Sequence, residues 1–195
     1  MGLGSSLRHN LSRLLRFGGR QSPAHFWPYA GFVIVLTMVG MAVAMLPFLF
    51  ETMTRMQRFA LAHPDQATVT SGPGSYSISI QGSHPELFPD MTPVMIGMAM
   101  VFAITIVLLA AATVRRLHDS GRTGLWGVMP IPFIAFSCAR MARLFTARDL
   151  DMAVFFSVFV SNLLYLLSLG LLVVLLVRPG TIGVNRFGVR DDDAG

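Results

Sequence analysis

Four long apolar stretches alternate with short polar segments along the chain. They cover residues 27–50, 93–114, 125–145 and 152–177, and all of them except 125–145 lack charged residues. A helix of about 20 apolar residues crosses the hydrocarbon core of a bilayer. The pattern therefore predicts an all-α integral membrane protein with four transmembrane helices, and residues 27–178 form its membrane domain.

The third stretch is shorter than the other three and is broken by prolines. Its uncharged part, Leu125 to Ala139, spans roughly 22 Å as a helix, against ~30 Å for the hydrocarbon core, and contains Pro130 and Pro132. It can cross only if it extends through Phe145 while its arginines reach outward to the interface. The alternative is a re-entrant element buried against its neighbours. We expect a short, Pro-broken crossing.

Residues 51–92 predict a small extracytoplasmic module. The first apolar helix should continue beyond the membrane to about Ala62, because no helix breaker precedes His63-Pro64-Asp65. Two β-prone runs, 68–70 and 76–80, flank Ser71-Gly72-Pro73-Gly74, which is typical of a β-hairpin. Acidic residues outnumber arginines in this segment, which favours the extracytoplasmic side.

The N-terminal segment, residues 1–26, is basic and amphipathic. Leucines at positions 3, 7, 11, 14 and 15 form one helical stripe, and basic residues lie opposite. The pattern predicts either a helix over residues 3–16 lying on an anionic membrane surface or a disordered basic leader. Phe26 and Trp27 open the first apolar stretch, and Trp126 opens the third. Aromatic residues at these places are expected to anchor the chain at the membrane interface.

Composition agrees with a membrane protein. The chain is 53% hydrophobic and 13% charged, and all fifteen basic residues are arginine. The arginines gather at the ends of apolar stretches rather than on one soluble face, so they indicate orientation in a membrane and not nucleic-acid binding. The single cysteine, Cys138, excludes an intramolecular disulfide.

The charge density peaks between the second and third stretches, in Arg115-Arg116-Leu117-His118-Asp119-Ser120-Gly121-Arg122-Thr123-Gly124. If the second helix continues here, Arg115, His118, Asp119 and Arg122 share one face, and Arg115 and Asp119 are spaced for an ion pair. Arg116 should project elsewhere, and Ser120-Gly121 should end the helix. Two hypotheses remain open. The arginines complement the helix C-terminus as a stop-transfer cluster, or they form a cradle for an anion or lipid headgroup.

Three segments together resemble the bacterial membrane family called domain of unknown function 805. They are Gly19-Arg20 with Phe26-Trp27, the Arg115–Gly124 motif with Trp126, and Pro179-Gly180 through Asn185-Arg186-Phe187-Gly188. Pro23 and Val189-Arg190 depart from the family pattern. The resemblance implies a small multi-pass protein of the bacterial inner membrane, with no established reaction to transfer.

With four crossings, the three segments meet on the cytoplasmic side, together with both termini and the Gly-rich, acidic tail 179–195. The predicted anion or lipid-headgroup site comprises Arg20, Arg115, Arg116, His118, Asp119, Arg122, Asn185 and Arg186. The expected partners are membrane lipids, in particular anionic phospholipids. The alternative function is an accessory or scaffold subunit with a membrane-protein partner or a second copy of the chain.

An enzyme or a coupled transporter is the less favoured interpretation. The sequence has no Ser-His-Asp spacing, nucleotide-binding fingerprint or metal-ligand spacing. The uncharged stretches also lack the buried charges of ion-coupled carriers. We therefore expect no catalytic residue, metal or cofactor.

Overall fold

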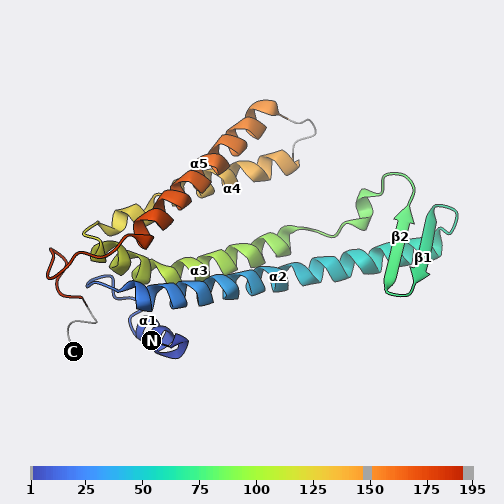
Figure 1. Cartoon of the computed structure of the whole chain (residues 1–195). Helices are drawn as coiled ribbons and strands as arrows, with labels where there is room; N and C mark the ends of the chain where they lie inside the picture. The colour runs from blue at the N-terminus through green and yellow to red at the C-terminus, as the bar shows by residue number, and fades with distance from the viewer. Residues whose placement is uncertain (1, 147–150, 191–195) are drawn as a thin grey trace. The chain divides into compact units, whose positions relative to one another are not determined.

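The computed structural model describes residues 2–146 and 151–190, with the backbone alone for 142–146. Two compact units make up the chain, Met1–Val33 with Ile106–Gly195, and Ile34–Thr105. Helices α2 (Pro23–Ala62) and α3 (Thr92–Asp119) contribute residues to both units (Figure 1). The predicted linker 147–150 and the acidic end 191–195 lie outside the described residues.

Four helical segments are long and apolar enough to cross a membrane, as the hydrophobic pattern predicted. They are α2, α3, the segment Gly124–Met141 and α5 (Met152–Val177). Helix α5 has the predicted bounds, and its N-terminus is capped by Asp151, whose carboxylate accepts bonds from the backbone N–H groups of Ala153 and Val154 at 2.9 and 3.3 Å. These lengths and compositions suggest a multi-pass membrane protein.

The third segment is broken, as its prolines predicted. It starts as a 3-10 helix, η2 (Gly124–Val128), and resumes after Pro130 as α4 (Ile131–Thr146). Proline near a helix start is tolerated because the first N–H groups have no intrahelical acceptor, and Pro132 occupies such a place. A Cβ at Gly124 would lie 2.8 Å from both methyl carbons of Val114, so η2 can lie against α3 only with glycine there.

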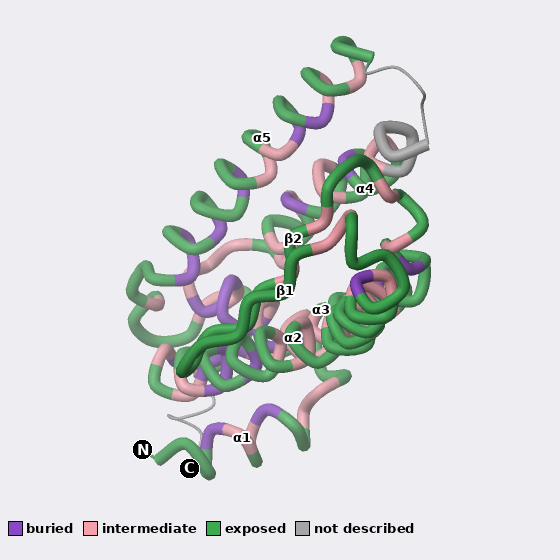
Figure 2. The backbone as a smooth tube through the Cα atoms, turned by 90° about the vertical axis from the view of Figure 1, so that its right-hand side faces the viewer, coloured by how far each residue is buried: buried purple, intermediate pink, exposed green. Residues whose placement is uncertain are grey.

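Helices α4 and α5 pack side by side in the first unit (Figure 1). The Ser161 hydroxyl of α5 donates to the Phe133 carbonyl of α4 at 2.9 Å. Ser161 therefore faces α4. Ser168 is also buried, and its hydroxyl donates to Tyr165 of the same helix. The buried positions of α5 recur along one side (Figure 2).

The apolar core of the first unit lies between the start of α2 and the ends of α3 and α5. Its buried members are Phe26, Tyr29, Ala30, Val33, Ala112, Leu117, Leu172, Leu175 and Leu176. Phe26 is only 2% exposed, which corrects its assignment as an interface anchor. Trp27 and Trp126 each remain 37% exposed. Successive helical residues point in different directions, so only one ring of the Phe26-Trp27 pair can face outward.

Helix α1 (Leu3–Leu11) is shorter than the predicted 3–16 and packs through polar residues. Ser6 donates to the backbone carbonyl of His25, and the Asn10 amide donates to the same carbonyl at 3.2 Å. Leu3 and Leu11 stay about half exposed. Leu7 of the same stripe is partly buried against the apolar core, so α1 packs through this leucine as well as through hydrogen bonds.

In the second unit, α2 continues to Ala62, as predicted, and leads into the predicted hairpin. Strands β1 (Ala67–Gly72) and β2 (Ser75–Ile80) pair antiparallel, with Val69 opposite Ile78. Gly74 has a φ of +79°, which the tight turn needs and glycine adopts without strain. A 3-10 turn, η1 (Pro85–Leu87), precedes α3.

Small and hydroxyl side chains bring α2 and α3 close together within this unit. The hydroxyls of Thr37 and Thr105 lie 2.7 Å apart. A Cβ at Gly97 would lie 3.2 Å from the Cβ of Ala44. Glycine at position 97 therefore allows the close approach of the two helices.

Candidate functional site

The end of α3 is closed by a glycine turn. Helix α3 ends at Asp119, and Gly121 follows with a φ of +75°. The Gly121 N–H donates to the His118 carbonyl at 3.0 Å, and the Arg122 N–H donates to the Leu117 carbonyl at 2.9 Å. The predicted stop at Ser120-Gly121 is confirmed, because a left-handed glycine lets these N–H groups turn back onto the helix.

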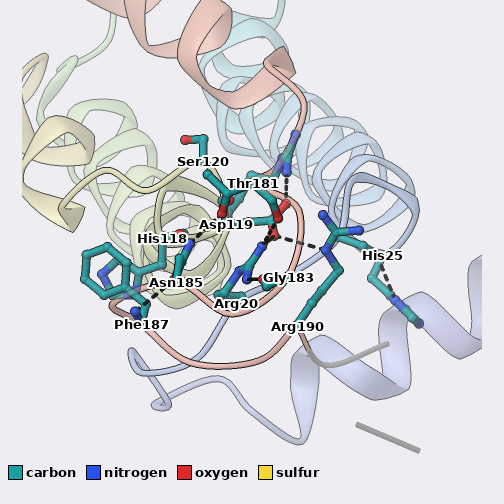
Figure 3. Close-up of polar contacts among 12 residues, drawn as sticks. Arg20, His25, His118, Asp119, Ser120, Thr181, Gly183, Asn185, Phe187 and Arg190 are labelled. Carbon is teal, nitrogen blue, oxygen red and sulfur yellow. Dashed lines mark hydrogen bonds and ion pairs between the residues drawn. The ribbon is translucent and has the colours of Figure 1, made fainter. Parts of the chain in front are cut away.

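The C-terminal tail satisfies the remaining carbonyls at this end of α3 (Figure 3). The Thr181 N–H donates to the Asp119 carbonyl at 2.8 Å. The Asn185 amide donates to the His118 carbonyl at 3.0 Å, and the Arg186 guanidinium donates to the Gly121 carbonyl at 2.9 Å. The last carbonyls of a helix have no partner within the helix, so the tail supplies partners for them.

Asp119 is the centre of a buried ion cluster, the Asp119 cluster, formed with Arg20, Arg116 and Arg190 (Figure 3). Its Oδ1 lies 3.0 Å from Arg20 Nη2 and 3.1 Å from Arg190 Nε, and its Oδ2 lies 2.5 Å from Arg116 Nη1. The side chains of Asp119, Arg20 and Arg116 are 0% exposed. These charges are stable out of water only because each one is paired and hydrogen-bonded.

The two buried arginines of the Asp119 cluster also bind backbone carbonyls of the tail and of α5. Arg20 donates to the carbonyls of Thr181, Gly183 and Gly188. Arg116 donates through Nε to Leu176 at 2.9 Å and through Nη2 to Arg178 at 2.5 Å. Arg116 therefore caps the C-terminus of α5, where a positive charge complements the helix dipole.

Arg115 holds the N-terminal segment in the same way. Its side chain is buried, and it donates to the carbonyls of Arg13 and Arg16 at 2.9 and 2.5 Å. Its other donors reach Gln21 Oε1 at 3.1 Å and Asn10 Oδ1 at 3.0 Å. One residue of α3 thus fixes the turn that follows α1.

These contacts revise the predicted roles within the motif. Arg116 was expected to project away from the face of Asp119. Of the three ion pairs in the Asp119 cluster, however, the one with Arg116 has the shortest distance, because residues three apart are neighbours on a helix. Arg20, Arg115 and Arg116 were expected to offer their donors to an external anion. Their guanidinium groups instead bind internal carbonyls and Asp119, so they form the scaffold of the site and not its surface.

Gly180 shows how closely the tail approaches the Asp119 cluster. A Cβ at this position would come within 2.6 Å of Arg190 Nη2 and closer still to the carboxylate of Asp119. Any larger residue would displace the carboxylate or the tail, which explains the glycine of the Pro179-Gly180 segment.

Two predicted arginines keep their guanidinium groups at the surface, each against an aromatic ring. Arg122 lies over Trp126, with its Cζ 5.6 Å from the ring centroid, and Arg186 lies over Phe187 at 4.7 Å. Phe187 stacks on His118 with the centroids 3.9 Å apart, and His118 Nδ1 lies 3.2 Å from the Gly19 carbonyl. We call Arg122 and Arg186 the surface pair. A ring that contacts the face of a guanidinium leaves its N–H edge open. Arg186 already donates one N–H of this edge, from Nη2, to the Gly121 carbonyl, so its other N–H groups are the ones that a ligand can bind.

Sequence analysis did not identify four residues that complete the site, Asn10, Gln21, Thr181 and Arg190. Arg190 had been noted only as a departure from the family pattern. Isolated amides and hydroxyls give no sequence signal. Asn10 and Gln21, for example, bind Arg115, which lies roughly a hundred positions away in the chain.

Positive charge dominates this region. Three fully buried arginines, Arg20, Arg115 and Arg116, face one buried carboxylate, that of Asp119. Within the first unit, Asp151 at the start of α5 is the one other acidic residue among those described. The described residues contain no group of three His, Cys, Asp or Glu side chains that could hold a metal ion. The arrangement therefore favours binding of an anion.

The fold and the site define a class of protein, a helical protein with four described segments long and apolar enough to cross a membrane, whose helix ends are joined by a buried arginine–aspartate cluster. The model of the family described as protein of unknown function (DUF805) matches residues 14–189. The chain therefore belongs to this family, as the three motifs indicated. The comparisons found no matching curated protein and no matching solved structure.

Proposed function

We propose that this chain is a multi-pass protein of the bacterial inner membrane whose surface pair, Arg122 and Arg186, binds the headgroups of anionic phospholipids at the cytoplasmic face. The observation that carries the proposal is the position of the two guanidinium groups. Both are held against aromatic rings at the turn that ends α3. The role is binding, and we propose no reaction.

The scaffold supports this role by keeping the surface pair in place. Arg186 belongs to the tail that caps α3, and Arg122 donates its backbone N–H to Leu117. Both are therefore fixed relative to the Asp119 cluster before any ligand arrives. A preorganised guanidinium loses less conformational entropy on binding than a freely moving one, which favours affinity.

Electrostatics supports the same ligand. Among the described residues of the first unit arginines outnumber carboxylates, and exposed Arg8, Arg16 and Arg178 add to the positive charge of the surface pair. Each arginine near an anionic membrane surface contributes about 1 kcal/mol to membrane attraction. Guanidinium groups also bind phosphate with two parallel hydrogen bonds.

Native mass spectrometry of the full-length protein in mild detergent tests the proposal. Equal amounts of phosphatidylglycerol and phosphatidylethanolamine are added, and the retained lipids are counted. Replacing the surface pair by Arg122→Gln and Arg186→Gln should lower the preference for phosphatidylglycerol about tenfold, the effect of losing about 1.4 kcal/mol. The double variant Arg122→Lys with Arg186→Lys should keep only part of the preference for phosphatidylglycerol, because lysine keeps the charge without the bidentate geometry.

The matched control is the Arg55→Gln and Arg58→Gln pair in the second unit. It removes the same charge from residues that lie outside the predicted cytoplasmic face, and it should leave the lipid preference unchanged. If both double variants lose the preference for phosphatidylglycerol equally, or if neither loses it, the surface pair is rejected as the site. A protein that co-purifies in a fixed ratio and is lost with the surface pair would instead favour the accessory-subunit function.

A further inference from the structure

A groove of about 600 Å³ runs along the shared flank of α4 and α5. Phe133 and Phe136 line it from α4, and Phe156, Val160 and Leu164 line it from α5. Its volume lies within the range of sites that bind small ligands. All its walls come from one unit of the chain, and its aromatic and aliphatic lining suits a hydrocarbon chain.

The polar groups in the groove wall are already satisfied. The Ser157 hydroxyl donates to the Val154 carbonyl at 2.7 Å, and the Ser161 hydroxyl donates to the Phe133 carbonyl at 2.9 Å. Both hydroxyls are therefore turned to the backbone. An occupant of the groove needs no hydrogen-bonding groups along the part that lies inside it.

A cation lies at the rim of this groove. The Cζ of Arg140 is 5.1 Å from the centroid of the Phe136 ring, which itself lines the groove. Arg140 is partly exposed and has no carboxylate partner among the described residues. Arg140 lies beside apolar side chains, where water screens charge less than in bulk, so an anionic group bound there would attract its guanidinium.

We propose that the α4–α5 groove binds one anionic phospholipid, with an acyl chain in the groove and the phosphate on Arg140. An apolar groove beside a cation that has no carboxylate partner among the described residues matches an amphiphile with a negative head. A transmembrane helix of a partner would cover the groove but would leave the charge of Arg140 uncompensated. This lipid site is distinct from the surface pair, because neither Arg122 and Arg186 nor the rings that they contact are among the residues that line the groove.

Two variants of the full-length protein test the two halves of the site by native mass spectrometry with phosphatidylglycerol and phosphatidylethanolamine. Arg140→Gln removes the cation and should lower the preference for phosphatidylglycerol about tenfold. Val160→Trp fills the groove and should abolish retention of the same lipid while Arg140 is intact. Val160 is half exposed, so the larger ring does not enter the core. Val173→Trp, at a similarly exposed valine of α5 outside the groove, is the matched control and should bind normally.

The outcomes separate this site from the surface pair. The proposal that the groove binds a lipid is supported if Arg140→Gln and Val160→Trp each lose one bound lipid while the surface-pair variant still retains that lipid. Loss in Arg140→Gln alone would mean that charge attracts lipid without the groove, and the proposal would fail. Unchanged retention in both variants, or a dimer that Val160→Trp disrupts, would also overturn it.

Discussion

Replacing Asp119 by Asn should unfold the protein more readily than any other change of a single charge. Asn keeps the size of the side chain but removes the negative charge that Arg20 and Arg116 share. Both arginines would then be buried without a counter-ion, and the amide N–H₂ of Asn would face their donors. The capping bonds from the tail to the end of α3 depend on the same geometry.

The expected loss is about 3–5 kcal/mol in the free energy of unfolding, the usual effect of removing one partner of a buried ion pair. All three side chains are 0% exposed, so solvent screening does not reduce this figure. Native proteins are stable by only about 5–15 kcal/mol in total. Asp119→Asn should therefore strongly lower both stability in detergent and the amount of protein in the membrane.

Chemical or thermal unfolding in detergent measures the effect, with Glu51→Gln as the control. Glu51 pairs with Arg55 at 2.6 Å, but both side chains are largely exposed, and such helix pairs contribute about 0.3–0.5 kcal/mol. The double variant Asp119→Asn with Arg20→Gln should lose less than the sum of its single variants, because the two residues interact directly. A loss for Asp119→Asn as small as that of the control would refute the structural role of the Asp119 cluster.

Three further predictions concern packing, burial and pH. Gly180→Ala should destabilise the protein by at least about 1–3 kcal/mol through overpacking against Asp119. Gly170→Ala is the control and should not destabilise it, because a Cβ there would have no atom within 4 Å; melting curves of the two variants test this. Ser137→Ala should raise the unfolding free energy by about 1 kcal/mol, because Ser137 Oγ is buried without a partner among the described residues, and a decrease would show that the hydroxyl is bonded. The hydrogen bond to Glu86 raises the pKa of His84, and backbone hydrogen bonding, followed by the bond to His84, lowers the pKa of Glu86. The ion pair is therefore fully present between the ordinary Glu pKa of 4.5 and the ordinary His pKa of 6.5. It is lost as pH rises through the raised pKa of His84 and as pH falls through the lowered pKa of Glu86. An NMR titration in which Glu86→Gln leaves the His84 midpoint unchanged would contradict this.

Hydrophobic length and breakers were enough to predict most of the fold. The bounds of α5, the continuation of α2 to Ala62 and the hairpin around Gly74 followed from uncharged runs, a His-Pro break and a glycine turn. These features depend on neighbours in sequence. The polar packing of α1 could not be predicted in the same way. Its leucine stripe suggested that the leucines are buried, whereas the buried residues of α1 are Ser6 and Asn10.

The motifs identified the residues of the site but not their partners. Helical spacing predicted that His118 and Asp119 lie with the arginines, yet it could not show that Arg20 and Arg190 meet at one carboxylate. Contacts between Arg20 and the tail join residues more than 160 positions apart. Only the folded chain reveals that four of the five predicted anion-binding arginines, Arg20, Arg115, Arg116 and Arg186, donate to carbonyls of the chain itself.

The contacts of Arg20 and Asp119 with the tail carry a consequence for membrane topology. The N-terminal segment, the end of α3 and the tail bind one another directly. In the proposed multi-pass protein all three would therefore lie on the same side of the membrane. An even number of crossings between Arg20 and Thr181 meets this requirement, and three crossings do not. Arginine counts cannot decide between them, because four crossings and three crossings each place ten of the fifteen arginines inside.

A pair of reporters fused in turn after Gly195 tests this shared face most directly. Cytoplasmic fluorescence without periplasmic phosphatase activity is the expected result, with four crossings and both termini inside. Periplasmic phosphatase activity without fluorescence would place the tail opposite the N-terminal segment, and it would contradict the Asp119 cluster together with the proposed headgroup site.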